Sequence, residues 1–294
     1  MRLKIGIELK LKKITLVGIT HIDASSQEKV TRVLNLIKPD AVCLELDEYR
    51  LKALIENDEI NKSSFFVDSI DENQNEEMEK IQEDQSIGNF SDEINFGESF
   101  SAILDDIGFF ESELARITKT DLAGKEMLVA YEHAKEIGAE IYLIDRSIHD
   151  ISKVMEEELS VEEAQKFQSL IDELMYDRTI IAQPAEKILE NKEKNNSFED
   201  LISDDENEEI NLNEVLEVFK DEDSLTNILQ IFNQNFPKLY SILLEDRNVF
   251  MSKEIMKVVL KHSNIVVIVG YGHLKEMKSI LTELNNSIQI EIAE

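Results

Sequence analysis

The stretch from Ile14 to Asp47 constrains the fold most, because it predicts a strand, a helix and a second strand in succession. An apolar run that starts at Ile14 leads directly to His21. Apolar side chains then recur at helical spacing until Pro39, and residues 41–47 form a second apolar run. A crossover this short between two apolar strands predicts a parallel, right-handed unit.

A Gly-x-x-His pattern follows a strand twice in this chain. Gly18-Ile19-Thr20-His21 ends the first strand, and Gly270-Tyr271-Gly272-His273 follows the apolar run 265–269. Strand patterns at both ends of the chain enclose a region of helical patterns. We therefore expect one α/β domain over residues 1–294, with a central, largely parallel sheet built from N- and C-terminal segments, flanked by helices, and a helical middle region.

Two acidic segments interrupt these patterns, at residues 58–97 and 195–217. Both are rich in Asp, Glu, Asn and Ser and poor in large apolar residues. Such segments bury too little apolar surface to offset the entropy of ordering. We expect both to be acidic inserts, the first of them mobile.

The net charge of −31, from 62 acidic and 31 basic residues, limits the choice of partners. Nucleic-acid phosphates and anionic lipids need clustered Lys and Arg, so this composition argues against both. Cys43 is the only cysteine, which excludes a disulfide within the chain and favours a reducing compartment. No apolar run approaches the roughly 20 residues that span a bilayer. We expect a soluble, cytoplasmic protein without membrane association, while the oligomeric state, including a homo-oligomer, stays open.

Reactive side chains gather at the ends of the predicted strands: His21, Glu45, Asp145 and His273. In open parallel sheets, ligands bind beyond the carboxyl ends of the strands. Two imidazoles and two carboxylates together are typical of a site for Zn²⁺, Mn²⁺, Co²⁺ or Fe²⁺. An open coordination position there would hold a water whose pKa the cation lowers.

Each of these residues also has a simpler interpretation. Glu45 can form a structural ion pair with Arg50 or Arg247. A histidine after a strand is more often a hydrogen-bonded structural residue than a ligand. A network of His and Glu side chains without any metal therefore remains an alternative. Cys43 lies in an apolar strand and is expected to belong to the core.

Four blocks of sequence resemble the TraB or pheromone-shutdown family, which is related to the TIKI metalloproteases and to ChaN and erythromycin-esterase-like proteins. The blocks are residues 16–21 with 38–47 and Arg50, residues 124–130 with 138–140 and 143–146, residues 246–251, and residues 269–273. Gly-Ile-Thr-His replaces the usual Gly-Thr-Ala-His in the first block, and Asp246 stands where the family has Glu.

The resemblance implies an α/β fold whose site gathers His21, Glu45 and His273, with four further residues close by: Glu126, Arg50, Asp145 and Arg247. In TIKI-like proteins such a site binds a divalent metal and cleaves peptides. The leading hypothesis is thus a metal-dependent peptidase that uses Mn²⁺, Co²⁺ or Zn²⁺. Glu126 would act as general base or extra ligand, and the two arginines would stabilise the oxyanion.

The alternative function is non-catalytic. The bacterial namesake of the family is associated with reducing the output of a peptide pheromone. A protein of this type could bind and sequester a peptide or another partner in the same crevice, and its acidic segments could attract basic ligands.

Overall fold

The computed structural model describes residues 11–19, 25–67, 124–176 and 222–293. Its strands are β1 (Lys13–Ile19), β2 (Ala41–Leu44), β3 (Glu140–Leu143), β4 (Asn264–Gly270) and β5 (Gln289–Ile292). Its helices are α1 (Ser25–Ile37), α2 (Glu48–Val67), α5 (Lys125–Glu136), α6 (Ile148–Glu158), α7 (Val161–Tyr176), α10 (Glu222–Asn235), α11 (Pro237–Tyr240), α12 (Asp246–Lys261) and α13 (Tyr271–Leu284). A π-helical turn, η4 (Ser241–Glu245), joins α11 to α12.

The five strands form one parallel sheet in the order β3-β2-β4-β1-β5. Strand β4, from the C-terminal part of the chain, lies between β1 and β2. The predicted sheet, built from both ends of the chain, is therefore confirmed. Its central strands are buried on both faces, which explains their uninterrupted apolar runs.

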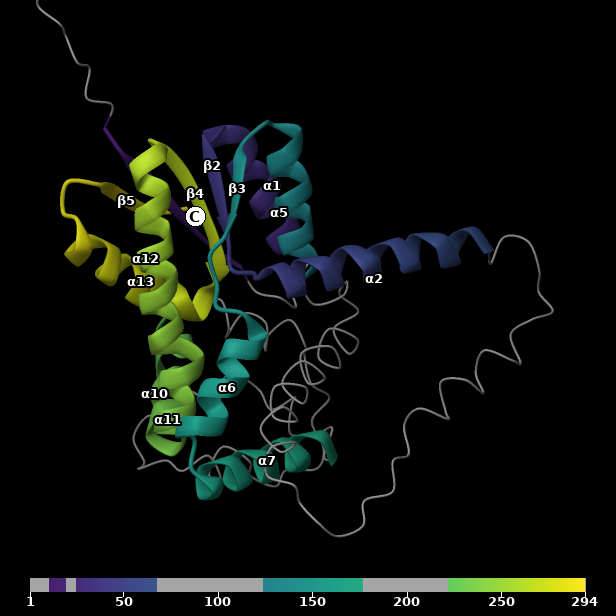
Figure 1. Ribbon diagram of the computed structural model, residues 1–294, viewed down its shortest axis with the longest axis vertical. Helices are drawn as coiled ribbons and strands as arrows, with labels where there is room; N and C mark the ends of the chain where they lie inside the picture. The colour runs from purple at the N-terminus through teal and green to yellow at the C-terminus, as the bar shows by residue number, and fades with distance from the viewer. Residues whose placement is uncertain (1–10, 20–24, 68–123, 177–221, 294) are drawn as a thin grey trace, which may run out of the picture.

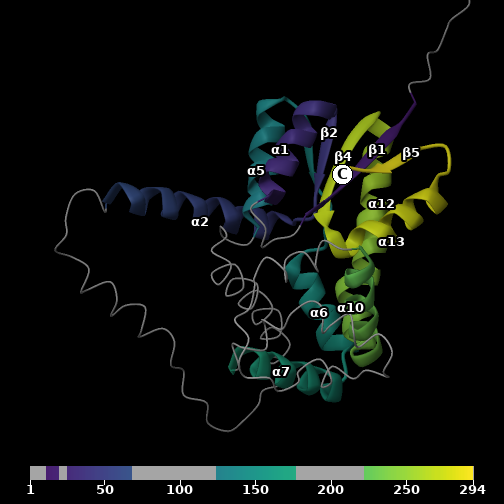
Figure 2. The same cartoon turned by 180° about the vertical axis from the view of Figure 1, so that it is seen from behind.

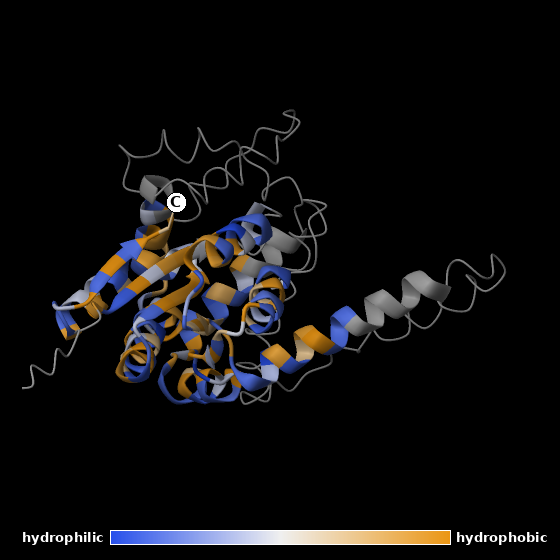
Figure 3. Cartoon of the chain, turned by 90° about the horizontal axis from the view of Figure 1, so that it is seen from above, coloured by the Kyte–Doolittle hydropathy of each residue, from blue (hydrophilic) through white to orange (hydrophobic). Residues whose placement is uncertain are grey.

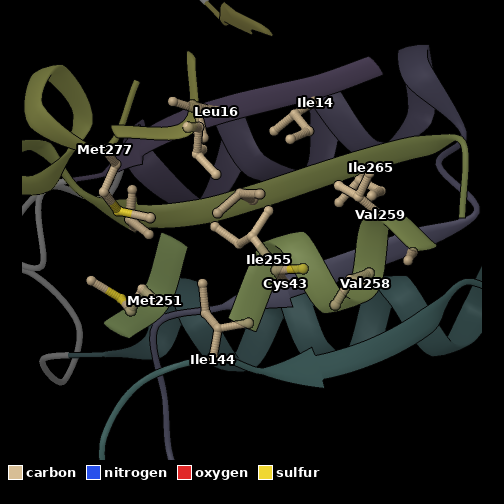
Figure 4. Close-up of a cluster of buried hydrophobic side chains, with 14 of the residues drawn as sticks. Ile14, Leu16, Cys43, Ile144, Met251, Ile255, Val258, Val259, Ile265 and Met277 are labelled. Atoms are coloured by element: carbon tan, nitrogen blue, oxygen red, sulfur yellow. The ribbon is translucent and has the colours of Figure 1, made fainter. Parts of the chain in front are cut away.

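Helices cover both faces of this sheet (Figures 1 and 2). On one face α1 and α5 pack against the strands through a first cluster of buried residues. On the other face α12 and α13 pack against the same strands through a second cluster. Figure 4 shows the second cluster, in which side chains of the strands meet those of the helices: Ile14, Leu16, Cys43, Ile265, Met251, Ile255, Val258 and Met277. Viewed from above, the strands with their hydrophobic, orange stretches lie between the two helical layers (Figure 3).

A helical lobe lies beyond the carboxyl ends of the strands (Figure 1). Helices α6, α7 and α11, with the end of α10 and the turn η4, share a third buried cluster: Ile151, Met155, Leu159, Ala164, Phe167, Phe236, Leu239 and Ile242. Phe236 precedes Pro237, whose fixed φ suits the first position of α11. This lobe and the carboxyl edge of the sheet enclose the region in which the predicted site residues gather.

Three details differ from the sequence predictions or lie outside the description. Helix α2 continues to Val67, so the first ten residues of the predicted insert at 58–97 are helical. Apolar residues at helical spacing predict a helix from Lys275 to Leu284, whereas α13 begins at Tyr271, which places His273 in its first turn. The rest of the first insert and the insert at 195–217 lie outside the described residues. The same holds for two further helices, which apolar residues at helical spacing predict at 100–117 and 179–191.

A groove of about 890 Å³ lies at the opposite edge of the sheet from the predicted site. Its lining includes Lys13 and Asn264, the first residues of β1 and β4, together with Leu36 and Glu291. The groove therefore belongs to the amino ends of the strands. In the described ranges, no helix combines the length and the apolar character that crossing a bilayer requires.

Candidate active site

Glu45 occupies the centre of the candidate site, directly after β2. Its backbone N–H extends the pairing with β4 by a hydrogen bond to Ile268. Its side chain is 93% buried. Oε2 accepts a 2.7 Å hydrogen bond from the backbone N–H of Gly270, at the end of β4. Oε1 accepts a 2.6 Å hydrogen bond from Nη2 of Arg247 and lies 3.0 Å from Nε2 of His273. Three elements thus converge on one buried carboxylate.

Asp145 follows β3 and joins two arginines. Its side chain is completely buried. Oδ2 accepts hydrogen bonds from Nη2 of Arg247 at 2.6 Å and from Nη2 of Arg50 at 2.8 Å. Oδ1 accepts from Nε of Arg247 at 3.1 Å and from the backbone N–H of Arg146 at 2.8 Å. The contact with Arg247 is bidentate, the strongest geometry of a guanidinium–carboxylate pair.

Asp47 anchors the other end of this network, where β2 passes into α2. Oδ1 accepts a 2.7 Å hydrogen bond from the backbone N–H of Arg50, so Asp47 caps the helix. Oδ2 accepts from Nε of Arg50 at 3.1 Å and from the backbone N–H of Ile148 at 2.8 Å, which ties α2 to the start of α6. The chain Asp47–Arg50–Asp145–Arg247–Glu45 is therefore one continuous set of charge-assisted hydrogen bonds.

The electrostatics of this set favour the ionised forms. Burial by itself raises the pKa of Asp145, but the charges and hydrogen bonds of Arg247, together with the charge of Arg50, outweigh burial and hold that pKa below its usual value. Burial likewise lowers the pKa of Arg247, and the carboxylates of Asp145 and Glu45 more than reverse the effect. The guanidinium therefore stays charged, and Asp145 stays a carboxylate, across the physiological range.

His273 faces Glu45 from the first turn of α13 and is buried. Its Nδ1 lies 2.6 Å from Oδ1 of Asn248, a completely buried residue of α12. Nδ2 of Asn248 donates a 2.8 Å hydrogen bond to Oε2 of Glu276, one turn further along α13. Both nitrogens of the imidazole therefore lie against oxygen atoms.

Arg247 and Asn248 owe their positions to the start of α12. The π-helical turn η4 immediately precedes them, and Nη1 of Arg247 donates a 2.9 Å hydrogen bond to the carbonyl of Leu243 within that turn. Turns of this kind occur frequently at functional sites, because the inserted residue rotates the following side chains. Here the two following side chains point to Glu45 and to His273.

The structure brings together five of the seven predicted site residues: Glu45, Asp145, His273, Arg50 and Arg247. The alternative ion pair of Glu45 with Arg247 is present as well. His21 lies outside the described residues. Ile19, two residues before His21, is the last residue of β1 and pairs with Gly270. Glu126 is buried in the first turn of α5, and α5 precedes β3, so this turn lies toward the carboxyl edge of the sheet.

Sequence reasoning missed two members of the network, Asp47 and Asn248. Asp47 carried a usable signal, since an Asp just before a helix is a favoured N-cap. Asn248 directly follows Arg247, but only the packing of α12 against α13 shows that it contacts His273.

Within the described ranges, no three His, Cys, Asp or Glu side chains are grouped as ligands of one metal ion. Cys43 is buried in the core, as predicted, and burial raises the pKa of its thiol, which argues against a nucleophilic role.

A glycine allows β1 to approach the turn that carries His273. A Cβ atom at Gly18 would lie 2.3 Å from Cδ1 of Leu274 and 2.8 Å from Cδ1 of Tyr271. We expect Gly18→Ala to lower the free energy of unfolding by about 1–3 kcal/mol, because the side chains of Leu274 and Tyr271 must shift within the packed core. Gly272→Ala is the matched control, since its Cβ would meet nothing closer than 3.7 Å and alanine favours the helix. Urea denaturation measures both, and equal effects would contradict this packing.

Two comparisons with known proteins show what this chain is similar to. A model of the TraB/PrgY/gumN family matches residues 7–288. The chain is also similar to the uncharacterized protein MJ1365 of Methanocaldococcus jannaschii, with 24% identity over 283 residues. The matched region is 96% of this chain and 56% of that protein, so the chain spans just over half the length of this relative.

Proposed function

This chain belongs to the TraB/PrgY/gumN family, and from that premise we propose that it is a metal-dependent hydrolase that acts on peptides. The observation that carries the proposal is the convergence of Glu45 and His273 at the carboxyl edge of the sheet, with Nε2 and Oε1 3.0 Å apart. A carboxylate and an imidazole that converge in this way form a typical pair of metal ligands.

The charges around this pair fit a bound cation. Among the described residues, the network holds three carboxylates, of Glu45, Asp47 and Asp145, against the guanidiniums of Arg50 and Arg247. Carboxylates outnumber guanidiniums among these five side chains, and buried carboxylates favour a cation nearby. His273 lies on the side of Glu45 where the cation is proposed.

In this proposal Glu45 and His273 hold Mn²⁺, Co²⁺ or Zn²⁺, and His21 supplies the third ligand. His21 follows β1, whose last residue pairs with Gly270, so its sequence position suits that role. When bound, the ion would lower the pKa of a water molecule and polarise a substrate carbonyl.

The remaining predicted residues take roles that their contacts permit. Glu126 would accept a proton from the attacking water, as general base. Arg50 is partly exposed, and in the described part of the chain its Nη1 has no hydrogen-bond partner, so this group could donate to an oxyanion. Arg247 is fully engaged with Asp145 and Glu45, so its contribution would be to orient Glu45 and to stabilise its charge.

The variant Glu126→Gln tests the proposed base. We expect hydrolysis of a quenched fluorescent peptide library to fall by about 10²–10⁴-fold while Zn²⁺ binding is retained, because the amide keeps the shape of the side chain but cannot accept the proton. Glu132→Gln, an exposed position on the same helix, is the control and should hydrolyse the library normally. Unchanged hydrolysis in Glu126→Gln would remove Glu126 from this role.

A non-catalytic peptide-binding or sequestering role is the second candidate. It is favoured by the closed network, in which Arg247 binds Asp145 while Asp47 accepts from Arg50 and from the backbone N–H of Ile148. Calorimetry with the same peptides separates the two functions. Stoichiometric binding with no product after long incubation with Mn²⁺, Co²⁺ or Zn²⁺ would support sequestration and exclude the hydrolase.

The cellular setting in this proposal follows from composition and family. A peptide substrate agrees with the pheromone-shutdown resemblance, and the net charge of −31 disfavours nucleic acid as a partner. A cytoplasmic location stays a prediction, and the oligomeric state stays open.

A further inference from the structure

The orientation of the Asn248 amide is fixed by chemistry. Asn248 is completely buried, and its two amide atoms lie 2.8 Å from Oε2 of Glu276 and 2.6 Å from Nδ1 of His273. A carboxylate only accepts hydrogen bonds, so the amide NH₂ must face Glu276. The amide oxygen then faces His273, and turning the amide over would place two acceptors together.

This orientation determines where the imidazole carries its proton. The amide oxygen of Asn248 is also a pure acceptor, so Nδ1 of His273 must be the donor. In the neutral ring the other nitrogen, Nε2, then presents a lone pair. That lone pair lies 3.0 Å from Oε1 of Glu45, which is an acceptor itself. Arg247 already donates to this Oε1, but two acceptors in contact without a hydrogen between them still repel each other, and a cation that binds both would relieve the repulsion.

We propose that Asn248 and Glu276 are positioning residues that hold His273 as the Nδ1–H tautomer, so that Nε2 and Glu45 together present two electron pairs to a cation. Neither residue touches the cation. Glu276 fixes the amide of Asn248, and Asn248 fixes the ring of His273. Hydrogen bonds of this kind behind a histidine ligand set its tautomer and strengthen its basicity.

The inference rests on the proposed function only for the identity of the cation. The tautomer is a property of the protein without metal. A simple structural role for His273 would put a proton on Nε2, because an Nε2–H group could donate a hydrogen bond to Glu45. Asn248 and Glu276 keep the single proton of the neutral ring on Nδ1, so a structural contact with Glu45 would require a ring with both protons, an outcome that the measurement below distinguishes.

Glu276→Gln tests the inference with little risk to the fold, since this side chain is only partly buried. A glutamine can turn its own oxygen toward Asn248, so the amide of Asn248 becomes free to turn over and donate to Nδ1. The Nε2–H tautomer, which donates to Glu45, then becomes the favourable one. Glu283→Gln, at an exposed position of the same helix, makes the same chemical change outside the network.

The measurement is ¹⁵N NMR of the histidine rings in metal-free protein, in alkaline buffer, with the His273 signals assigned by comparison with His273→Gln. We expect a proton on Nδ1 only in the wild type and in Glu283→Gln, and a majority of Nε2–H in Glu276→Gln. A wild-type ring with its proton on Nε2, a ring that keeps both protons, or an unchanged tautomer in Glu276→Gln would overturn the inference.

Zn²⁺ titration of the same three proteins distinguishes this inference from the proposed function. Glu276→Gln should bind Zn²⁺ about 10–100-fold more weakly than the wild type, as expected for loss of a hydrogen bond behind a ligand, and Glu283→Gln should bind it normally. Equal Zn²⁺ affinity in all three would overturn the positioning role. If the wild type shows the expected tautomer but binds no Zn²⁺, the tautomer assignment is supported and the proposed metal-dependent hydrolase is contradicted.

Discussion

Arg247→Met is expected to lower the free energy of unfolding by about 3–5 kcal/mol, because it leaves two buried carboxylates without the guanidinium that joins them. Arg247 makes a bidentate pair with Asp145 and a third charge-assisted hydrogen bond to Glu45. Methionine fills a similar volume but offers no donor. Burial then acts on Asp145 with Arg50 and the backbone N–H of Arg146 to oppose it but without Arg247, so the pKa of this carboxyl should rise relative to the wild type.

Arg146→Met is the matched control for this variant, because it makes the same change at the next arginine along the chain. The Arg146 guanidinium lies 5.4 Å from the ring centre of Phe250, a cation–π contact that contributes about 1 kcal/mol or less at such a site. Urea denaturation gives the free energy of unfolding of both variants. A loss below about 1 kcal/mol in Arg247→Met would show that the network does not hold the carboxylates as described.

Glu45→Gln is expected to weaken Zn²⁺ binding by more than about 100-fold, because it removes a proposed ligand rather than a hydrogen bond behind one. The fold should survive. The amide oxygen can still accept from Gly270, and the amide NH₂ can donate to Nε2 of His273. The same NH₂ would face a donor of Arg247, so a loss of about 1–3 kcal/mol in stability should accompany the change.

Asp47→Asn provides the comparison for this second variant. Asp47 belongs to the same network, but its contacts are with Arg50 and Ile148 and not with His273. It should lose stability without losing Zn²⁺ affinity. Isothermal titration calorimetry with Zn²⁺ measures the affinity of the two folded variants. An equal loss of affinity in both would mean that Glu45 acts through the stability of the network and not as a ligand.

The local units of this fold could be predicted from the sequence because their patterns are local. The apolar runs that became β1 and β2 and the helical spacing between them specify a strand–helix–strand unit without reference to the rest of the chain. The insertion of β4 between β1 and β2 could not be derived in the same way. It depends on pairing between residues more than 200 positions apart, for which a single sequence gives no register.

The start of α13 is a second feature that could not be predicted from the sequence. Two glycines in Gly270-Tyr271-Gly272 disfavour a helix there, so propensity predicts a later start. Tertiary contacts reverse that preference, since the backbone N–H of Gly270 donates to Glu45 and Leu274 packs into the core. His273 is consequently a helical residue, which aims its ring at Glu45.

The rule that ligands bind beyond the carboxyl ends of parallel strands predicted which residues lie at the site, but not which side chains they contact. It placed Glu45 and Asp145 at the ends of two strands, and the order β3-β2-β4 shows that these strands are neighbours. It could not show that Asp145 binds Arg50 and Arg247 through their side chains and Arg146 only through its backbone N–H. Those choices depend on where α2 and α12 begin, which only the folded chain determines.

The metal content of the protein tests the central claim most directly. Untagged wild-type protein, incubated with Mn²⁺, Co²⁺ and Zn²⁺ and then freed of unbound metal, should contain about one divalent ion per chain by elemental mass spectrometry. Folded His273→Gln should contain none. A wild-type protein that retains no ion under these conditions, or a His273→Gln variant that retains as much as the wild type, would contradict a cation site at Glu45 and His273.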